Sequence, residues 1–191
     1  MKIVPRRLGL VLLMTLVVAY LGTNIIPAAG QKAIGNYPIP KHGTLELNVP
    51  TAWKSEVHKP QESLPPTIIF DPPRENDFQV MITVLWSKTG EQDFNSQNKV
   101  RPLVEKDGKK LLPNTAETKI VLKEIKGVTH TGYYFSVTDK APNPGEYRYM
   151  TRGAIGVGNL LLNFTILHRL RNSQSVQEAL SMLRDAKQRT K

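Results

Sequence analysis

The stretch Phe78–Trp86, FQVMITVLW, decides the fold of this chain. Bulky apolar residues alternate along it, which is typical of a pleated strand with β-branched and aromatic side chains. The residues expected on one side are Phe78, Val80, Ile82, Val84 and Trp86. The other side holds Gln79, Met81, Thr83 and Leu85, two of which are apolar. Because that second side is also partly apolar, we expect a central strand that is covered on both faces.

Short alternating segments of the same kind lie before and after this strand. They are Thr44–Val49, Trp53–Val57, Thr67–Phe70, Glu117–Ile125, Thr129–Thr138, Tyr147–Ile155 and Leu160–His168. Their close spacing favours antiparallel neighbours, and we expect the first two to pair across a tight bend. Asp139–Gly145 is expected to be a hairpin loop. The glycines of Gly153–Gly158 predict a hairpin or bulge, since a dinucleotide-binding loop would lead into a helix.

Two segments have helical spacing instead. Asn95–Leu112 carries apolar residues at roughly helical intervals, and a helix start near Pro102 is favoured because the missing N–H costs least there. The clearer helix begins near Ser175, which fits a capping box with Glu178 ahead of an apolar stripe ending at Leu183. Antiparallel strands with two helices predict an α+β fold, and cover on both sheet faces predicts an α/β/α sandwich.

The first thirty residues have the order of a secretory signal peptide. Lys2, Arg6 and Arg7 make a basic head, Leu8–Leu21 is an uncharged apolar run, and Gly22–Gly30 is rich in small residues. We expect residues 1–30 to be cleaved off and the protein to be secreted or periplasmic. The alternative is an uncleaved membrane anchor formed by residues 8–30, because the uncharged stretch is long enough to span a bilayer.

The rest of the chain divides into a linker over residues 31–43, which holds two prolines and two glycines, and one domain over residues 44–191. Three of the 26 Lys and Arg and none of the 16 Asp and Glu precede Gln31, so the 161 residues that follow carry a formal charge of +7. A moderately basic exported domain can meet an acidic protein face, anionic lipid or acidic glycan. An exported location argues against nucleic acid as a partner.

The residue types exclude several kinds of chemistry. The chain has no cysteine, which excludes thiol chemistry, iron–sulfur clusters and Cys-ligated zinc. The four histidines show no metal-ligand spacing, and we expect no metal or cofactor. His130, Ser136 and Asp139 contain the residue types of a hydrolytic triad, but Ser136 falls in a predicted strand and not on a Gly-x-Ser-x-Gly elbow. A hydrolase would need a site assembled from residues far apart in sequence.

Basic and aromatic residues gather on or next to Tyr147–Ile155 and Leu160–His168, two strands that we expect to pair. The candidate partner-binding patch comprises Tyr147, Arg148, Tyr149, Arg152, Arg169 and Arg171. Tyr and Arg are the residue types that anchor protein interfaces. On a shared face these residues form a basic patch for a partner. The alternative is a solvated sheet edge, where charges prevent aggregation.

Several strand motifs follow one another in a recognisable order. Gly132–Phe135 (GYYF), Tyr147–Gly153 (YRYMTRG) and Asn159–Ile166 (NLLLNFTI) lead into the terminal helix, and Val49-Pro50 with Trp53 stands near the start of the domain. This order resembles the PsbP-like family, named for an extrinsic subunit of photosystem II. The family shares its fold with a eukaryotic nuclear-import factor and with many secreted bacterial proteins.

The resemblance covers most of residues 43–187 and includes no catalytic signature. It implies an α/β/α sandwich with a non-enzymatic binding or assembly role, and it does not imply photosystem binding. The charged N-terminal segment of the photosystem subunit has no counterpart in Gln31–Gly43, so no functional residue is carried over. We therefore expect a non-catalytic module that contacts another exported or membrane protein. The alternatives are a hydrolase with a dispersed site and a basic module that docks on anionic lipid or glycan.

Overall fold

The computed structural model describes residues 31–59, 64–73, 77–171 and 173–190. The signal-peptide prediction for residues 1–30 lies outside these ranges. In the part of the chain that is described, none of the helices combines the length and hydropathy needed to cross a lipid bilayer. The elements are β1 (Lys32–Pro38), β2 (Thr44–Pro50), β3 (Lys54–His58), β4 (Thr67–Asp71), β5 (Phe78–Trp86), α1 (Gln97–Leu111), a 3₁₀ turn (Leu112–Asn114), β6 (Lys123–Lys126), β7 (Thr131–Thr138), β8 (Tyr149–Val157), β9 (Leu160–His168), α2 (Gln174–Arg184) and β10 (Lys187–Arg189).

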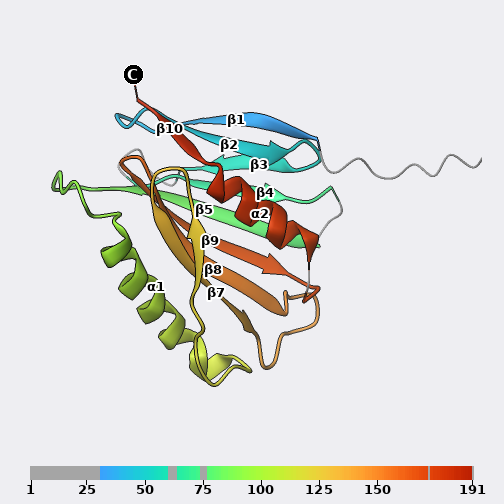
Figure 1. Ribbon diagram of the computed structural model, residues 1–191. Helices are drawn as coiled ribbons and strands as arrows, with labels where there is room; N and C mark the ends of the chain where they lie inside the picture. Colours follow the sequence, from blue (N-terminus) through green and yellow to red (C-terminus); the bar gives the residue numbers. More distant parts are fainter. Residues whose placement is uncertain (1–30, 60–63, 74–76, 172, 191) are drawn as a thin grey trace, which may run out of the picture.

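A seven-stranded antiparallel sheet forms the middle of the molecule, in the order β3-β4-β5-β9-β8-β7-β6 (Figure 1). Helix α1 lies on one face of this sheet and α2 on the other, so the predicted α+β sandwich is confirmed. The opening stretch is β5, which pairs with β9 over its whole length, from Phe78 opposite His168 to Trp86 opposite Leu160. The expected hairpin between β8 and β9 is also present, and Gly158 takes a positive φ of 56° in its turn.

The face that carries α2 contains the larger hydrophobic core. Ile82, Phe164 and their neighbours on this face are fully buried against α2 and a second sheet of order β1-β2-β10. Burying such a side chain contributes about 1.5–3 kcal/mol. The opposite face is covered by α1 mainly over β7 and β8, where Val100 and Val104 meet Phe135. Met81 on β5 is only half-buried there, so the predicted cover of β5 on both faces is partial.

Helix α1 begins at Gln97, five residues before Pro102, so the predicted start near Pro102 is wrong. Pro102 lies inside the helix on its exposed side and gives up one backbone hydrogen bond. The buried positions Val100, Val104 and Gly108 recur every four residues and hold the helix to the sheet. Packing of this stripe outweighs the cost of the proline.

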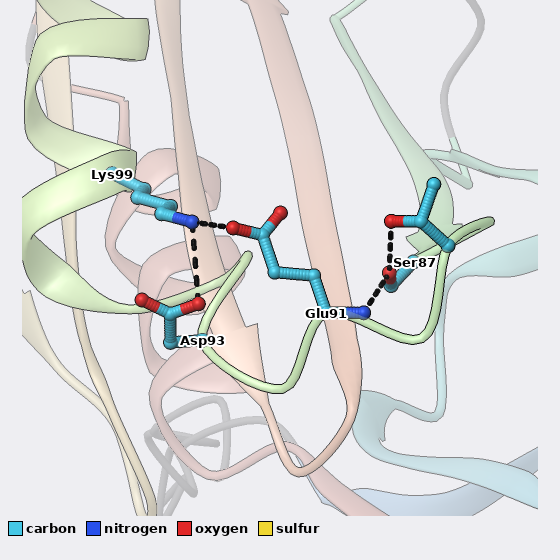
Figure 2. Close-up of polar contacts among 5 residues, drawn as sticks. Ser87, Glu91, Asp93 and Lys99 are labelled. Carbon is cyan, nitrogen blue, oxygen red and sulfur yellow. Dashed lines mark hydrogen bonds and ion pairs between the residues drawn. The ribbon is translucent and has the colours of Figure 1, made fainter.

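Polar contacts fix the loop between β5 and α1 (Figure 2). The hydroxyl of Ser87 accepts a hydrogen bond from the backbone N–H of Glu91 at 2.8 Å. The ammonium group of Lys99, in the first turn of α1, contacts the carboxylates of Glu91 and Asp93, the latter at 3.2 Å. Exposed pairs of this kind contribute little stability, about 0–1 kcal/mol, so their effect is to set where the loop meets the helix.

The predicted linker over residues 31–43 is wrong, because Lys32–Pro38 forms β1 and pairs with β2 along its whole length. Its one buried side chain is Tyr37, which meets Phe70 edge-on at 5.9 Å. Strand β2 therefore pairs with β1 and not with β3, which joins β4 in the larger sheet. An edge strand held mainly by backbone hydrogen bonds leaves almost no apolar pattern in the sequence.

Two further element boundaries differ from the prediction. The expected strand Glu117–Ile125 pairs only from Lys123 onward, where β6 runs over Lys123–Lys126, and residues 117–122 are irregular. Helix α2 starts one residue before Ser175, with Ser173 at its N-cap, so Ser175 is a buried residue of the first turn and the capping box is not formed. After α2 the chain adds β10 to the small sheet, where the Gln188 side chain donates to the His42 carbonyl at 2.7 Å.

Candidate functional site

A hollow of about 730 Å³ lies between α2 and the β6–β9 part of the sheet. We call it the α2 cleft. The strand side chains on its wall include Lys123, Tyr134, Ser136, Tyr149, Thr151 and His168. The other side is contributed by Glu117, by Arg171, and by the first half of α2, including Gln174 and Gln177. A volume of this size is within the range of small-molecule sites, about 300–1,000 Å³.

Strand register explains why polar groups meet in the α2 cleft. Ser136 on β7 lies opposite Thr151 on β8, and directly opposed residues point to the same face of a sheet. Their hydroxyl groups are 2.9 Å apart and share a hydrogen bond. In the next row of the same face, Tyr149 on β8 lies opposite His168 on β9. The strands therefore place a polar strip beneath α2, beside the apolar core.

Glu117 is held by the end of β7. Its two carboxylate oxygens accept hydrogen bonds from the backbone N–H and the hydroxyl of Thr138, at 2.8 and 2.9 Å. Burial by itself would raise the pKa of Glu117, but the two hydrogen bonds and the positive charge of Arg171 outweigh it and lower the pKa below its ordinary value. The carboxylate is thus ionised and already bonded within the protein.

His168 is the most unusual residue of the cleft, because its side chain is buried with 3% of its surface exposed. Its Nδ1 atom lies 2.8 Å from the carbonyl oxygen of Leu170. A carbonyl can only accept, so Nδ1 carries the proton and Nε2 is left as an acceptor. Nε2 is buried and has no hydrogen-bond partner among the described residues. The Tyr149 ring stacks on the imidazole at 5.5 Å, and burial lowers the pKa of His168.

The predicted patch does not lie on one face. Tyr149 and Arg171 line the α2 cleft, and the Arg169 guanidinium stacks over the Tyr147 ring at 5.4 Å. Arg152 lies on the other face, where it forms an ion pair with Asp107 of α1. Arg148 is exposed, and its carbonyl accepts a backbone hydrogen bond from Asp139 across the hairpin. The strands do pair as expected, but successive residues of a strand alternate between faces, which separates Arg152 from Tyr149.

The residues of the considered hydrolytic triad bond elsewhere. His130 contacts the hydroxyl of Thr129, Ser136 contacts Thr151, and Asp139 accepts from the N–H of Ala141. None of these hydrogen bonds joins one member of the triad to another. Within the described ranges, no three His, Asp or Glu side chains come together in a group that could hold a metal ion.

Sequence reasoning missed the Glu117–Thr138 contact and the buried state of His168. A usable signal was present in Thr131–Thr138, where polar Ser136 and Thr138 share one side of a strand whose other side carries Phe135 and Val137. A strand that is apolar on one side and polar on the other usually exposes its polar side to solvent. Here α2 covers part of the polar side, so the strip becomes a cleft.

The comparisons with known proteins concern the fold. Neither protein-family models nor curated protein sequences match this chain. The solution structure of cyanobacterial PsbP (CyanoP) from Synechocystis sp. PCC 6803 is similar, with a TM-score of 0.52 and 11% identity over 85% of this chain and 96% of that one. A crystal structure from Bacteroides thetaiotaomicron VPI-5482 has a TM-score of 0.51 and 15% identity over 77% of this chain. The match spans 46% of the Bacteroides protein, less than half of its length.

These similarities concern the fold of most of this chain. They also agree with the resemblance drawn from the strand motifs. The chain therefore has the PsbP-like fold.

Proposed function

We propose that this protein is an exported, non-catalytic binding or assembly module that contacts another exported or membrane protein beside the α2 cleft. The observation that carries the proposal is the grouping of Tyr147, Tyr149, Arg169 and Arg171, which we call the Tyr–Arg patch. Tyr149 and Arg171 line the cleft, and Tyr147 and Arg169 stack on each other two residues away along the chain. Tyr and Arg side chains of this kind anchor interfaces.

The bonding within the cleft supports a binding role over hydrolysis. Ser136 is bonded to Thr151, and Glu117 holds Thr138, so neither group is engaged with a base or nucleophile. A nucleophile needs a base within hydrogen-bond reach and a third group that orients the base. The resemblance of the strand motifs to the PsbP-like family also implies a non-enzymatic binding or assembly role.

A pull-down from an envelope fraction tests the interface. The Arg171→Glu variant reverses an exposed charge of the Tyr–Arg patch, and Lys106→Glu reverses an exposed charge on α1, on the other face. Mass spectrometry identifies the captured partner. We expect Arg171→Glu to reduce its recovery at least fivefold and Lys106→Glu to leave it unchanged. Equal recovery with both variants would count against the Tyr–Arg patch.

Export is tested separately, since it rests on the basic head, apolar run and small-residue tail of residues 1–30. Cell fractionation with N-terminal sequencing of the recovered protein should give a chain that begins at Gln31 outside the cytoplasm. A chain that keeps residues 1–30 in the membrane fraction would support the anchor alternative. Recovery of the full chain in the cytoplasm would refute export.

A further inference from the structure

We propose that the α2 cleft binds an acidic sugar unit, with its carboxylate at Arg171 and Lys123 and its hydroxyl groups at the Ser136–Thr151 pair and Nε2 of His168. The inference deepens the proposed function and rests on it in one respect, that the protein is a binding module. It concerns a ligand inside the cleft, whereas the partner protein meets the Tyr–Arg patch, of which Tyr149 and Arg171 also line the cleft.

The charge of the cleft wall favours an anion. Lys123 and Arg171 are its two cations, and Glu117 is its one carboxylate among the described lining residues. Both oxygens of Glu117 already accept hydrogen bonds from Thr138. The remaining positive charge is therefore offered to a ligand, and an Arg guanidinium suits a carboxylate because both groups are planar and can form paired hydrogen bonds.

The uncharged groups favour a ligand with hydroxyl groups. Ser136 and Thr151 share one hydrogen bond, and each hydroxyl can both donate and accept, so the pair keeps further capacity toward a polyol. Gln174 and Gln177 of α2 add side-chain amides to the same cleft. Such a mixture of hydroxyls and amides matches the alternating donors and acceptors of a sugar ring better than it matches an acyl chain.

His168 favours an acidic sugar over a simple carboxylate. Nε2 presents a lone pair, since Nδ1 carries the proton that bonds Leu170. A buried acceptor without a partner costs about 1–3 kcal/mol, and only an O–H or N–H donor relieves that cost. The oxygens of a fatty-acid carboxylate carry no proton near neutral pH and would meet the lone pair unfavourably. A sugar hydroxyl donates to it.

Nε2 is covered in the structure, so a ligand in the cleft reaches it only when a neighbouring side chain moves. The Tyr149 ring is half-buried, lines the cleft and stacks on the imidazole. Displacement of this ring by a sugar ring would open the edge of the imidazole. The inference therefore predicts that binding changes the environment of both Tyr149 and His168.

The test is an NMR titration of the ¹⁵N-labelled protein, residues 31–191, with four probes. D-Glucuronate carries carboxylate and hydroxyls, D-glucose has hydroxyls alone, cyclohexanecarboxylate has the charge alone, and acetyl-glycyl-glycine represents a peptide carboxylate. We expect D-glucuronate to bind at least tenfold more tightly than each of the others and to shift the Nε2 resonance of His168. Tightest binding of the peptide, or of cyclohexanecarboxylate, would overturn the inference.

Substitutions test which residues contact the carboxylate and the hydroxyl groups of the sugar. Arg171→Gln should lower the affinity for D-glucuronate about tenfold, toward that of D-glucose, a loss of about 1.4 kcal/mol, and should leave D-glucose binding unchanged. His168→Phe keeps an aromatic ring against Tyr149 but lacks the acceptor, and should weaken both sugars about tenfold. His168→Gln, whose amide oxygen can stand near the position of Nε2, should recover part of the affinity. Lys106→Gln on α1 is the control and should change nothing.

The outcomes distinguish this inference from the proposed function. If none of the probes shifts a cleft resonance, the sugar inference fails, while partner capture through the Tyr–Arg patch stands on its own experiment. If Arg171→Gln leaves the preference for D-glucuronate over D-glucose intact, the assigned carboxylate contact is wrong. Because Arg171 is exposed, this variant is expected to fold even where His168→Phe does not.

Discussion

The Nη2 atom of Arg152 on β8 lies 2.8 Å from the Oδ2 atom of Asp107 on α1, and this ion pair joins the helix to the sheet. On the same row of the sheet, Phe135 stands opposite Arg152 and packs against the buried stripe of α1. Arg152 therefore belongs to the α1 face. Its charge is paired with Asp107, and the sheet separates it from the Tyr–Arg patch.

Removing the carboxylate of Asp107 should destabilise the protein modestly. Both side chains are about one-third exposed, at 33% and 32%, so solvent screens the pair and Asp107→Asn should lower the free energy of unfolding by about 1 kcal/mol. Chemical denaturation measures this. The control is Glu105→Gln, which breaks the more exposed pair with Lys109 on the same helix and should cost less stability than Asp107→Asn. Equal losses in the two variants would mean that the Arg152–Asp107 pair contributes no more stability than the more exposed Lys109–Glu105 pair.

Substitution of two glycines that have nearly the same φ value tests how β10 is held in the small sheet. Gly43 and Gly90 have φ values of 79° and 77°, which disfavour any residue with a Cβ. A Cβ at Gly90 meets nothing, whereas a Cβ at Gly43 would overlap the carbonyl oxygen of Arg189 on β10. We expect Gly90→Ala to cost about 1 kcal/mol of stability and Gly43→Ala about 3 kcal/mol.

Hydrogen exchange locates the effect. In Gly43→Ala the amides of β10 should exchange much faster than in the wild type, and in Gly90→Ala they should not change. The side chain of Gln188 reports the same displacement, because it bonds His42 and the N–H of Asn159. Equal stability of the two variants, with β10 protected in both, would refute the close contact at Gly43.

His168 should make stability fall on the acid side of neutrality. Burial lowers its pKa in the folded state below the ordinary value of 6.5, so below that pH the unfolded chain binds the proton more readily. The free energy of unfolding should be level above about pH 6.5, as far as His168 determines it, and should decline as the pH falls through the lower folded pKa. The charged cleft groups Glu117, Lys123 and Arg171 share this environment.

Urea denaturation at pH 7.5 and 5.5 measures the decline, and His168→Gln removes the titrating group. The variant should lose less stability than the wild type between these two values. Glu117 does not interfere, because its own pKa is lowered below 4.5 and its contribution is lost only in more acidic solution. A wild type and variant with the same pH dependence would show that the His168 ring is not kept neutral by burial.

Most strands of the large sheet could be predicted from the sequence. Alternation in Phe78–Trp86 and in Leu160–His168 is a local property, because successive side chains of any strand point to opposite faces. Both segments form strands within a residue of the expected bounds. The helix starts were less predictable. Packing of Val100 draws the start of α1 ahead of Pro102, and no rule of local propensity includes that contact.

Strand partners were harder to predict than strands. Residues 31–43 have the composition of a linker, yet Lys32–Pro38 pairs with β2 through its backbone. This pairing, and the addition of β10 from the far end of the chain, depend on backbone groups that are the same in every residue type. For that reason the second sheet leaves no pattern in the amino-acid sequence.

The sequence by itself determined the alternating strands, the absence of cysteine chemistry and the residue types Tyr149 and Arg171 that the structure finds at the cleft. Only the tertiary structure decided which of these residues meet. Strand register assigns Arg152 to one face and Tyr149 to the other, and the position of α2 makes it line one cleft with His168 and the hydroxyl pair. The physical reason is that a cleft is formed by surfaces from distant parts of the chain, whose distances depend on packing and not on spacing along the sequence.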